Sequence, residues 1–339
     1  MFLLLRKFIM LVIFPVAFIA CSSGNESRDE NRSESAVVPV DSSVRPTDID
    51  FSKLTDSALR ECVEKTGTIT ISELVYLECA GMDISNASGI EQLSALEVLS
   101  LSFNQLSAID VSRNVALTQL LLEGNKLTEV DFLENTALEW MYLGGNQIKS
   151  IDVSLNTDLT NLSLWGNQLT EIDISANAAL VDLELRDNRL ETIDVSWNTA
   201  LARLSLDINE LTELVLSSNE ALKSLSVTYN ALTFIDLSMN QKLEHLNLWG
   251  NELDMIDLSL NIALNSLELG ENKLTTIDVS TNAKLRWLSI KSNNLVALDV
   301  SANTELMNLY LSGNLIYCSD IQDIIYQYST VEVGDCIAD

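Results

Sequence analysis

The most regular set of chemically active side chains in this sequence is a row of aspartates spaced 21 residues apart. Its members are Asp110, Asp131, Asp152, Asp173, Asp194, Asp236, Asp257, Asp278 and Asp299, and Val215 occupies the one break. Serine follows two places later in nearly every case, as at Ser112. Carboxylate oxygens suit Ca²⁺, but the Gly-rich spacing of Ca²⁺-binding β-helix repeats is absent. We therefore expect the row to hydrogen-bond to neighbouring backbone and hydroxyl groups, and we expect no metal site.

Side chains spaced for catalysis are scarce. His245 is the single histidine, and the spacing gathers no partners around it for a catalytic triad. The sequence has no phosphate-binding glycine loop and no His-Glu-x-x-His zinc motif. Acidic residues are numerous enough to leave a glycosidase-like carboxylate pair open, yet a repetitive surface rarely provides a closed pocket. We expect a protein that is not an enzyme and uses no cofactor.

The charge of the chain restricts its partners. Its 49 acidic and 20 basic residues give a net charge of −29. Nucleic acid is excluded as a natural partner because its phosphates would be repelled, and an anionic membrane surface is disfavoured for the same reason.

The aspartate row belongs to a 21-residue repeat. One asparagine column runs unbroken from Asn104 to Asn314, a second runs from Asn114 to Asn303, and leucine fills the column from Leu96 to Leu306. The repeated Leu-x-Leu places two leucines on one side of an extended segment, and asparagine can turn the chain and satisfy buried backbone groups. This pattern predicts coils with a short strand in each half, joined by asparagine corners. One coil cannot bury its apolar face alone, so the coils must stack.

The unit resembles the leucine-rich repeat family, in its bacterial 21-residue type with a nested second half. The resemblance covers about Leu74 to Ile316, and its general architecture is internalin-like. It implies a mostly β repeat solenoid, a right-handed coil or horseshoe with short strands on both sides and disulfide-linked caps. Residues 47–95 would form the N-terminal cap, with a short helix between Asp50 and Thr66 and a first unit of 22 residues. Residues 96–316 would hold the repeats, and residues 317–339 the C-terminal cap.

The first 20 residues are typical of a lipoprotein signal peptide. Arg6 and Lys7 precede a short apolar run that ends at Phe18 and is too short to span a bilayer comfortably. The run leads into Cys21, and this junction resembles a lipobox in which Cys21 is lipidated. Phe18 stands where leucine is usual, so an ordinary signal peptide with an unmodified Cys21 is the alternative. Residues 21–46 are rich in Ser, Asn and charge, which predicts a lipid anchor followed by a disordered tether.

The remaining cysteines lie in pairs at the two ends of the predicted solenoid. Disulfides are expected outside the cytoplasm, so we predict the bonds Cys62–Cys79 and Cys318–Cys336, one in each cap. By resemblance, Ser22 after the lipobox cysteine favours the outer membrane of a Gram-negative cell. The expected location is therefore the cell envelope, facing either the periplasm or the medium.

Variable positions beside the paired leucines predict a binding face. These positions point outward on one sheet, which is the usual ligand face in the leucine-rich repeat family. Four of the five tryptophans fall there, and only Trp197 lies on the other half of a coil. Tryptophan is enriched where partners dock. The candidate residues are Trp140, Tyr142 and Trp165 in a first patch, Tyr229, His245 and Trp249 in a second, the charged residues Asp182, Glu184, Arg186, Arg203 and Asp207 between them, and Trp287 and Tyr310 beyond.

Together these features predict a lipid-anchored envelope module that binds a protein partner and contacts the membrane only through its anchor. A glycan is the alternative ligand, because aromatic faces beside carboxylates and amides suit sugar rings. A structural envelope protein or a signalling adaptor without catalytic activity is a further alternative. In that case the aromatic residues would only shield neighbouring strands.

Overall fold

The computed structural model describes residues 47–317, 319 and 330–332. The described part contains one α-helix, two short 3₁₀ helices and a parallel sheet of 13 strands. The helices are α1 (Ser57–Lys65), η1 (Ile71–Glu73) and η2 (Ile90–Gln92). The strands are β1 (Tyr76–Glu78), β2 (Val98–Ser100), β3 (Gln119–Leu121), β4 (Trp140–Tyr142), β5 (Asn161–Ser163), β6 (Asp182–Glu184), β7 (Arg203–Ser205), β8 (Ser224–Ser226), β9 (His245–Asn247), β10 (Ser266–Glu268), β11 (Trp287–Ser289), β12 (Asn308–Tyr310) and β13 (Thr330–Glu332). Cys21, Cys318, Cys336, the signal peptide, the tether and most of the C-terminal cap lie outside the described residues.

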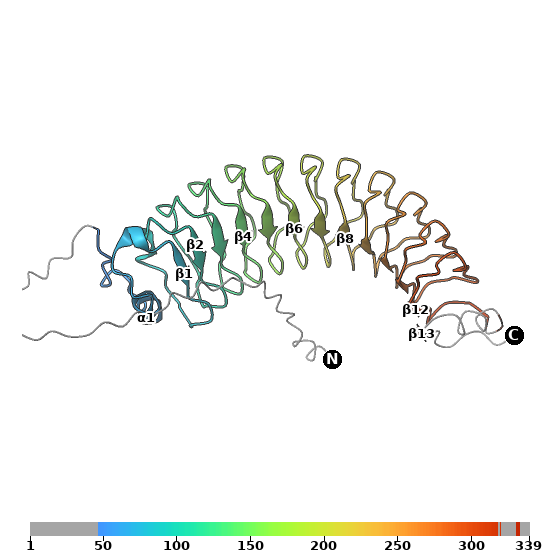
Figure 1. Ribbon diagram of the computed structural model, residues 1–339, viewed down its shortest axis with the longest axis horizontal. Helices are drawn as coiled ribbons and strands as arrows, with labels where there is room; N and C mark the ends of the chain where they lie inside the picture. Colours follow the sequence, from blue (N-terminus) through green and yellow to red (C-terminus); the bar gives the residue numbers. More distant parts are fainter. Residues whose placement is uncertain (1–46, 318, 320–329, 333–339) are drawn as a thin grey trace, which may run out of the picture. The chain divides into compact units, whose positions relative to one another are not determined.

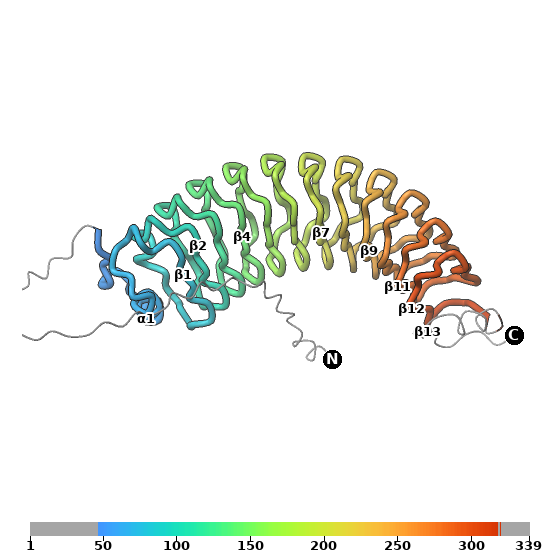
Figure 2. The backbone as a smooth tube through the Cα atoms, in the orientation of Figure 1, coloured from blue at the N-terminus to red at the C-terminus, as the bar shows by residue number. Residues whose placement is uncertain are grey.

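The strands pair in chain order, which confirms the predicted repeat solenoid. Consecutive strands between β2 and β12 pair in parallel one 21-residue period apart, as Trp140 does with Asn161. The first pairing joins Tyr76 to Val98, which fits the predicted 22-residue first unit. Figure 1 shows the strands side by side, and Figure 2 shows the backbone leaving the sheet after each strand and returning to it one coil later. Leucines of every coil meet in one continuous core.

The second half of the repeat differs from the prediction. In the described coils it forms tight turns instead of a second strand. The N–H of Asn114 donates to the carbonyl of Val111 (2.9 Å), and the N–H of Leu117 donates to the carbonyl of Asn114 (3.1 Å). These short-range bonds use backbone groups that a strand ladder would need, so this side of the coil closes by turns.

Two asparagine ladders hold successive coils together. In the first, the Nδ2 of Asn167 donates to the carbonyls of Leu143 (3.1 Å) and Leu164 (3.0 Å), and its Oδ1 accepts the N–H of Ile148 (3.0 Å). In the second, the Nδ2 of Asn177 donates to two carbonyls, including that of Val153 (3.0 Å). These bonds confirm that asparagine satisfies buried backbone groups at the corners of each coil.

The N-terminal cap closes the first coil. Helix α1 lies within the segment predicted to be helical, and Asp56 caps it by accepting the N–H groups of Ala58 and Leu59. The other carboxylate oxygen of Asp56 accepts the N–H of Ser85 (2.9 Å), which ties the helix to the first repeat. The predicted disulfide Cys62–Cys79 is confirmed, and it joins α1 to the residue after β1. None of the described helices has the length and apolar character needed to cross a membrane.

Candidate binding face

The outward residues of the strands form a continuous surface, which we call the sheet face. Alternation within each strand produces it: in β4, Trp140 is 39% exposed, Met141 is fully buried, and Tyr142 is half-buried. The sheet face also includes the residue two places after the end of each strand, such as Trp165, which follows β5. Every candidate residue of the first patch, the charged centre and the second patch lies on this face or at its edge.

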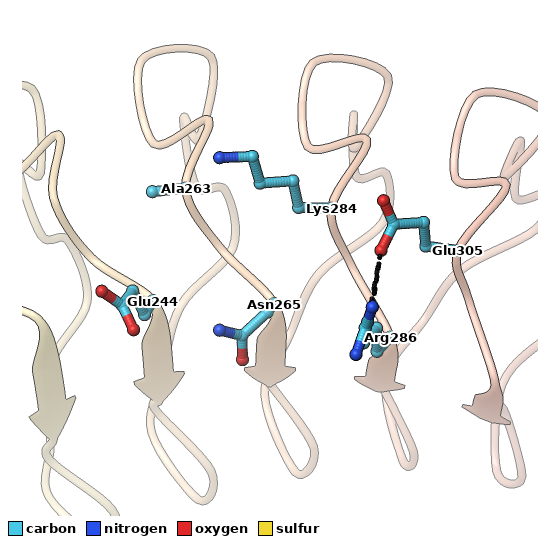
Figure 3. Close-up of a pocket in the computed structure, with 6 residues that line it drawn as sticks. All are labelled: Glu244, Ala263, Asn265, Lys284, Arg286 and Glu305. Atoms are coloured by element: carbon cyan, nitrogen blue, oxygen red, sulfur yellow. Dashed lines mark hydrogen bonds and ion pairs between the residues drawn. The ribbon is translucent and has the colours of Figure 1, made fainter.

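A charged hollow of 490 Å³ lies where the chain enters β9 to β11. Its lining residues are Glu244, Ala263, Asn265, Lys284, Arg286 and Glu305. Arg286 pairs with Glu305 at 3.1 Å, and Lys284 extends toward Ala263 (Figure 3). Because two bases here balance two acids, the hollow has no net charge to select an ionic ligand.

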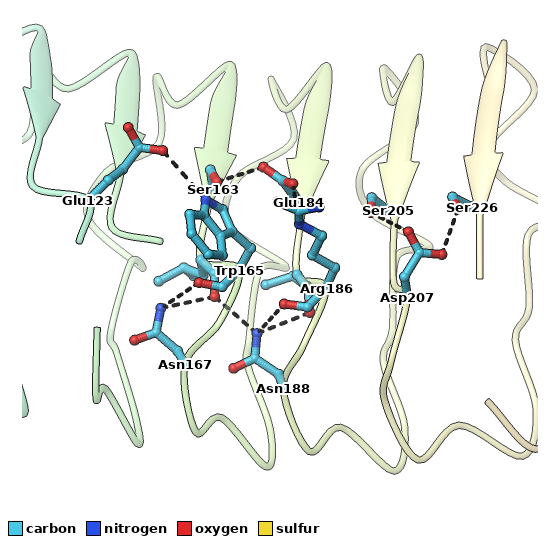
Figure 4. A network of polar contacts seen from close by, with 12 residues as sticks. Glu123, Ser163, Trp165, Asn167, Glu184, Arg186, Asn188, Ser205, Asp207 and Ser226 are labelled. Atoms are coloured by element: carbon cyan, nitrogen blue, oxygen red, sulfur yellow. Dashed lines mark hydrogen bonds and ion pairs between the residues drawn. The ribbon is translucent and has the colours of Figure 1, made fainter. Parts of the chain in front are cut away.

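Trp165 is the most firmly held aromatic residue of the first patch. Its indole lies against the backbone of Gly144, where a Cβ would overlap the ring. The guanidinium carbon of Arg186 lies 5.0 Å from the ring centroid, within the range of a cation–π interaction. The Nε1–H points to the Oε1 of Glu123 at 3.5 Å, two coils away (Figure 4). The ring is therefore fixed from three directions before any partner binds.

A second group of polar contacts extends this arrangement. The Nε of Arg186 lies 3.0 Å from Glu184 Oε1, and the hydroxyl of Ser163 donates to Glu184 Oε2 (2.9 Å). Burial raises the pKa of Glu123, the nearby charge of Glu184 adds to this rise, and the Trp165 hydrogen bond opposes it. We call Glu123, Ser163, Trp165, Glu184 and Arg186 the Trp165 cluster. Its carboxylates and guanidinium are held in fixed positions suited to directional recognition.

The other two aromatic residues of the first patch contact each other. The rings of Trp140 and Tyr142 lie 6.4 Å apart, tilted by 55°. Burial raises the pKa of the Tyr142 hydroxyl, and the negative charges of Asp182 and Glu123 add to the effect. Tyr142 therefore presents a neutral hydroxyl beside an exposed indole at neutral pH.

The charged centre is mostly paired within the sheet. Arg203 binds the Oδ2 of its register neighbour Asp182 through Nε (2.9 Å) and Nη2 (2.6 Å). Asp207 accepts the hydroxyl of Ser226 at 2.5 Å (Figure 4). It also accepts the N–H of Thr228 at 2.7 Å. These contacts leave the central strands with fixed charges of both signs.

Two further aromatic groups lie beyond the centre. Tyr229 is exposed and rests against Gly250, while the indole of Trp249 lies over Gly270. His245 is exposed at the start of β9. Trp287 and Tyr310 form a third group, with ring centroids 4.9 Å apart and Lys291 Nζ 4.9 Å from the Tyr310 ring.

The repeat period places Glu123, Gly144, Ser163, Gly270 and Lys291 in the outward columns of this face, but it does not single them out as candidate binding residues. A signal for two of them was present, since Gly144 precedes Trp165 and Gly270 follows Trp249 in a single repeat column. A glycine one period from a tryptophan indicates that the indole lies flat on the neighbouring coil.

The aspartate row is hydrogen-bonded as predicted. The Oδ1 of Asp173, for example, accepts the N–H of Ser175 (2.9 Å), and the same bond recurs along the row. These bonds to serine lower the pKa of Asp173 below its ordinary value. Among the described residues, no group of three or more His, Cys, Asp or Glu side chains could hold a metal ion.

Comparison with known proteins agrees with this architecture. No protein-family model and no curated protein matches the chain. Among solved structures, the functional domain of InlJ from Listeria monocytogenes has a TM-score of 0.81 and 28% identity, over 85% of this chain and 71% of that one. An internalin (InlF) from the same species has a TM-score of 0.77 and 25% identity, over 88% and 94%. The LRR protein LIC12759 from Leptospira interrogans has a TM-score of 0.69 and 22% identity, over 79% and 80%.

The fold and these neighbours define a leucine-rich repeat solenoid. More particularly, its architecture is similar to that of the internalin structures. The InlJ domain includes a cysteine ladder, whereas this chain has no cysteine between residues 80 and 317 and uses asparagine ladders throughout. Solenoids of this kind are typically protein-interaction modules, which directs attention to the sheet face.

Proposed function

We propose that the chain is a lipid-anchored protein of the cell envelope that binds a protein partner through the sheet face. The observation that carries this proposal is the Trp165 cluster. It holds an aromatic ring, a guanidinium and two carboxylates in fixed positions on an open surface, between two other aromatic groups. Prearranged aromatic and arginine side chains are the usual anchors of protein interfaces, because little entropy is lost when they bind.

A structural neighbour supports the choice of a protein ligand. The leucine-rich repeat ectodomain of a plant receptor kinase from Arabidopsis thaliana was solved in complex with CASPARIAN STRIP INTEGRITY FACTOR 2. That ectodomain shares the fold at 21% identity, with a TM-score of 0.62. The fold therefore accommodates protein ligands, and the identity of the partner here depends on this chain's own side chains.

Affinity capture from the cell envelope tests the binding face. The bait is the full chain, compared with a variant in which Trp140, Trp165, Trp249 and Trp287 are each changed to Ala. Trp197→Ala is the matched control, because Trp197 is 64% exposed but lies off the sheet. We expect a protein that the wild type and the control retain and the fourfold variant loses, with circular dichroism showing that all three fold.

Equal recovery with every bait would reject the sheet face as a protein-docking surface. A glycan array then tests the alternative ligand, which is favoured by the indole of Trp249 lying flat over Gly270 in the manner of a sugar-stacking platform.

The lipid anchor needs its own test. We expect labelled palmitate to be incorporated into the wild-type chain and not into Cys21→Ala. Cleavage before Cys21 without label would instead identify an ordinary export signal and remove the anchor from the proposal.

A further inference from the structure

An apolar patch lies on the half of the coils outside the sheet, at the place where the aspartate row is interrupted. Val215 is 66% exposed and Phe234 is 61% exposed, and Met239 is exposed beside them. These three side chains line a hollow of 540 Å³, together with Glu213 and Asp236. Met255 and Leu260, one period after Phe234 and Met239, are also exposed and extend the surface by one coil. We call Val215, Phe234, Met239, Met255 and Leu260 the Val215 patch.

Folding does not account for the valine. In the flanking coils, Asp194 accepts the N–H of Ser196 and Asp236 accepts the N–H of Ser238, both at 2.9 Å. Ser217, the equivalent serine two places after Val215, is still present. The coil has therefore kept the donor of the turn and replaced the acceptor by an apolar side chain that is left largely in water.

We propose that the Val215 patch is a second docking surface, which binds a partner protein segment combining apolar side chains with lysine or arginine. The argument is charge complementarity, because Asp194, Asp236 and Asp257 border the patch in the same row and are exposed. Their serine hydrogen bonds lower the pKa of each carboxyl, so all three are ionised at neutral pH. An apolar centre rimmed by carboxylates attracts basic apolar segments.

The same charges disfavour other occupants. A second copy of the chain would bring two aspartate rows together, and an anionic lipid surface would be repelled by the row and by the net charge of −29. The surface lies outside the sheet, so the inference does not depend on the function proposed for the sheet face.

The proposal is tested by measuring peptide binding to the full chain carrying Cys21→Ser. This substitution removes the lipid attachment point and keeps every other residue. Three fluorescent peptides of equal length are compared by anisotropy: alternating Leu and Lys, alternating Leu and Glu, and alternating Ser and Lys. We expect the Leu–Lys peptide to bind most tightly. Val215→Asp should weaken that binding about tenfold, because it removes one buried apolar side chain from the contact.

The direction of the change separates this proposal from simple charge attraction. Val215→Asp adds a negative charge, so a basic peptide held by charge attraction alone would bind this variant as tightly as the wild type or more tightly. The variant is expected to fold normally, since Ser217 can donate to the new carboxylate. Phe234→Thr provides a second test, and Leu155→Ser is the matched control, because Leu155 is exposed on the equivalent turn of a distant coil.

Three results would overturn the proposal. The first is that the Leu–Lys peptide binds Val215→Asp and Phe234→Thr as tightly as the wild type, or more tightly. The second is that the Leu–Glu peptide binds the wild type as tightly as the Leu–Lys peptide does. The third is that the wild type sediments as a dimer and Val215→Asp sediments as a monomer. The last result would assign the Val215 patch to a second copy of the chain.

Discussion

At the residue scale, glycine determines how two tryptophans lie on the sheet face. Gly144 and Gly270 leave room for the indoles of Trp165 and Trp249, and a Cβ at either position would overlap a ring. Neither glycine needs a left-handed backbone, so steric room is what selects glycine at both sites. The aromatic residues are thereby held close to the backbone, which limits the conformational entropy that binding would cost.

Gly144→Ala should displace the indole of Trp165 and break its contacts with Glu123 and Arg186. We expect a loss of about 1–3 kcal/mol in the free energy of unfolding, as for other overpacked sites, measured by urea denaturation. The double variant Gly144→Ala/Trp165→Ala is the control, because alanine at 144 fits once the ring is absent. If alanine at 144 costs as much in the Trp165→Ala background as in the wild type, the steric explanation is wrong.

The aspartate row should make stability depend on acid pH. The hydroxyl and then the N–H of Ser301 lower the pKa of Asp299 in the folded chain. The stabilising contribution of Asp299 is therefore complete above its unfolded pKa of about 3.9, and it is lost as the pH falls through the lower folded pKa. Asp299→Ala should melt at a lower temperature than the wild type at pH 7, and the gap should shrink below about pH 4. A gap that stays constant from pH 7 to pH 2.5 would contradict this account.

At the scale of the repeated element, the two asparagine ladders are not equivalent. First-column asparagines use both ends of the amide: Asn188 Oδ1 accepts the N–H of Leu169, and its Nδ2 donates to backbone carbonyls that include Leu164. In the second column, Asn198 Nδ2 donates to two carbonyls, but its Oδ1 is buried without a hydrogen-bond partner in the described part of the chain. A buried amide oxygen without a donor lowers the net contribution of this column.

Asn188→Ala should therefore destabilise the chain more than Asn198→Ala. The first change leaves an additional backbone N–H unsatisfied, and such a group costs about 1–3 kcal/mol when it is buried. Both variants can be compared by urea denaturation at one pH, with Leu155→Ser as an exposed-site reference. Equal losses would mean that the Oδ1 acceptor of the first column contributes little.

At the scale of the whole molecule, the sequence period predicts the solenoid and the membership of each sheet column, and the placement of cysteines in pairs at the two ends predicts the Cys62–Cys79 bond. The period sets which residues share a column, but it does not set the direction in which a side chain lies along that column. Trp165 lies over Gly144 in the preceding coil, whereas Trp249 lies over Gly270 in the following one. The apolar alternation in the second half of the repeat matches that of the first half and predicts a strand. In the structure, the turns favoured by Asp and Asn prevail there instead.

A one-dimensional architecture should tolerate the loss of one complete coil. Deleting residues 285–305 removes β11 and both partners of the Arg286–Glu305 pair together, and it brings β12 beside β10 in an unchanged register. The backbone pairing and the asparagine ladders join each coil to its immediate neighbours, so we expect a folded chain with a modestly lower melting temperature by circular dichroism. Deleting only residues 285–294 should abolish cooperative unfolding, because it places the turns of one coil against the strand of the next and interrupts both asparagine ladders. Cooperative unfolding of the half-coil deletion would show that the asparagine register is not what holds the coils together.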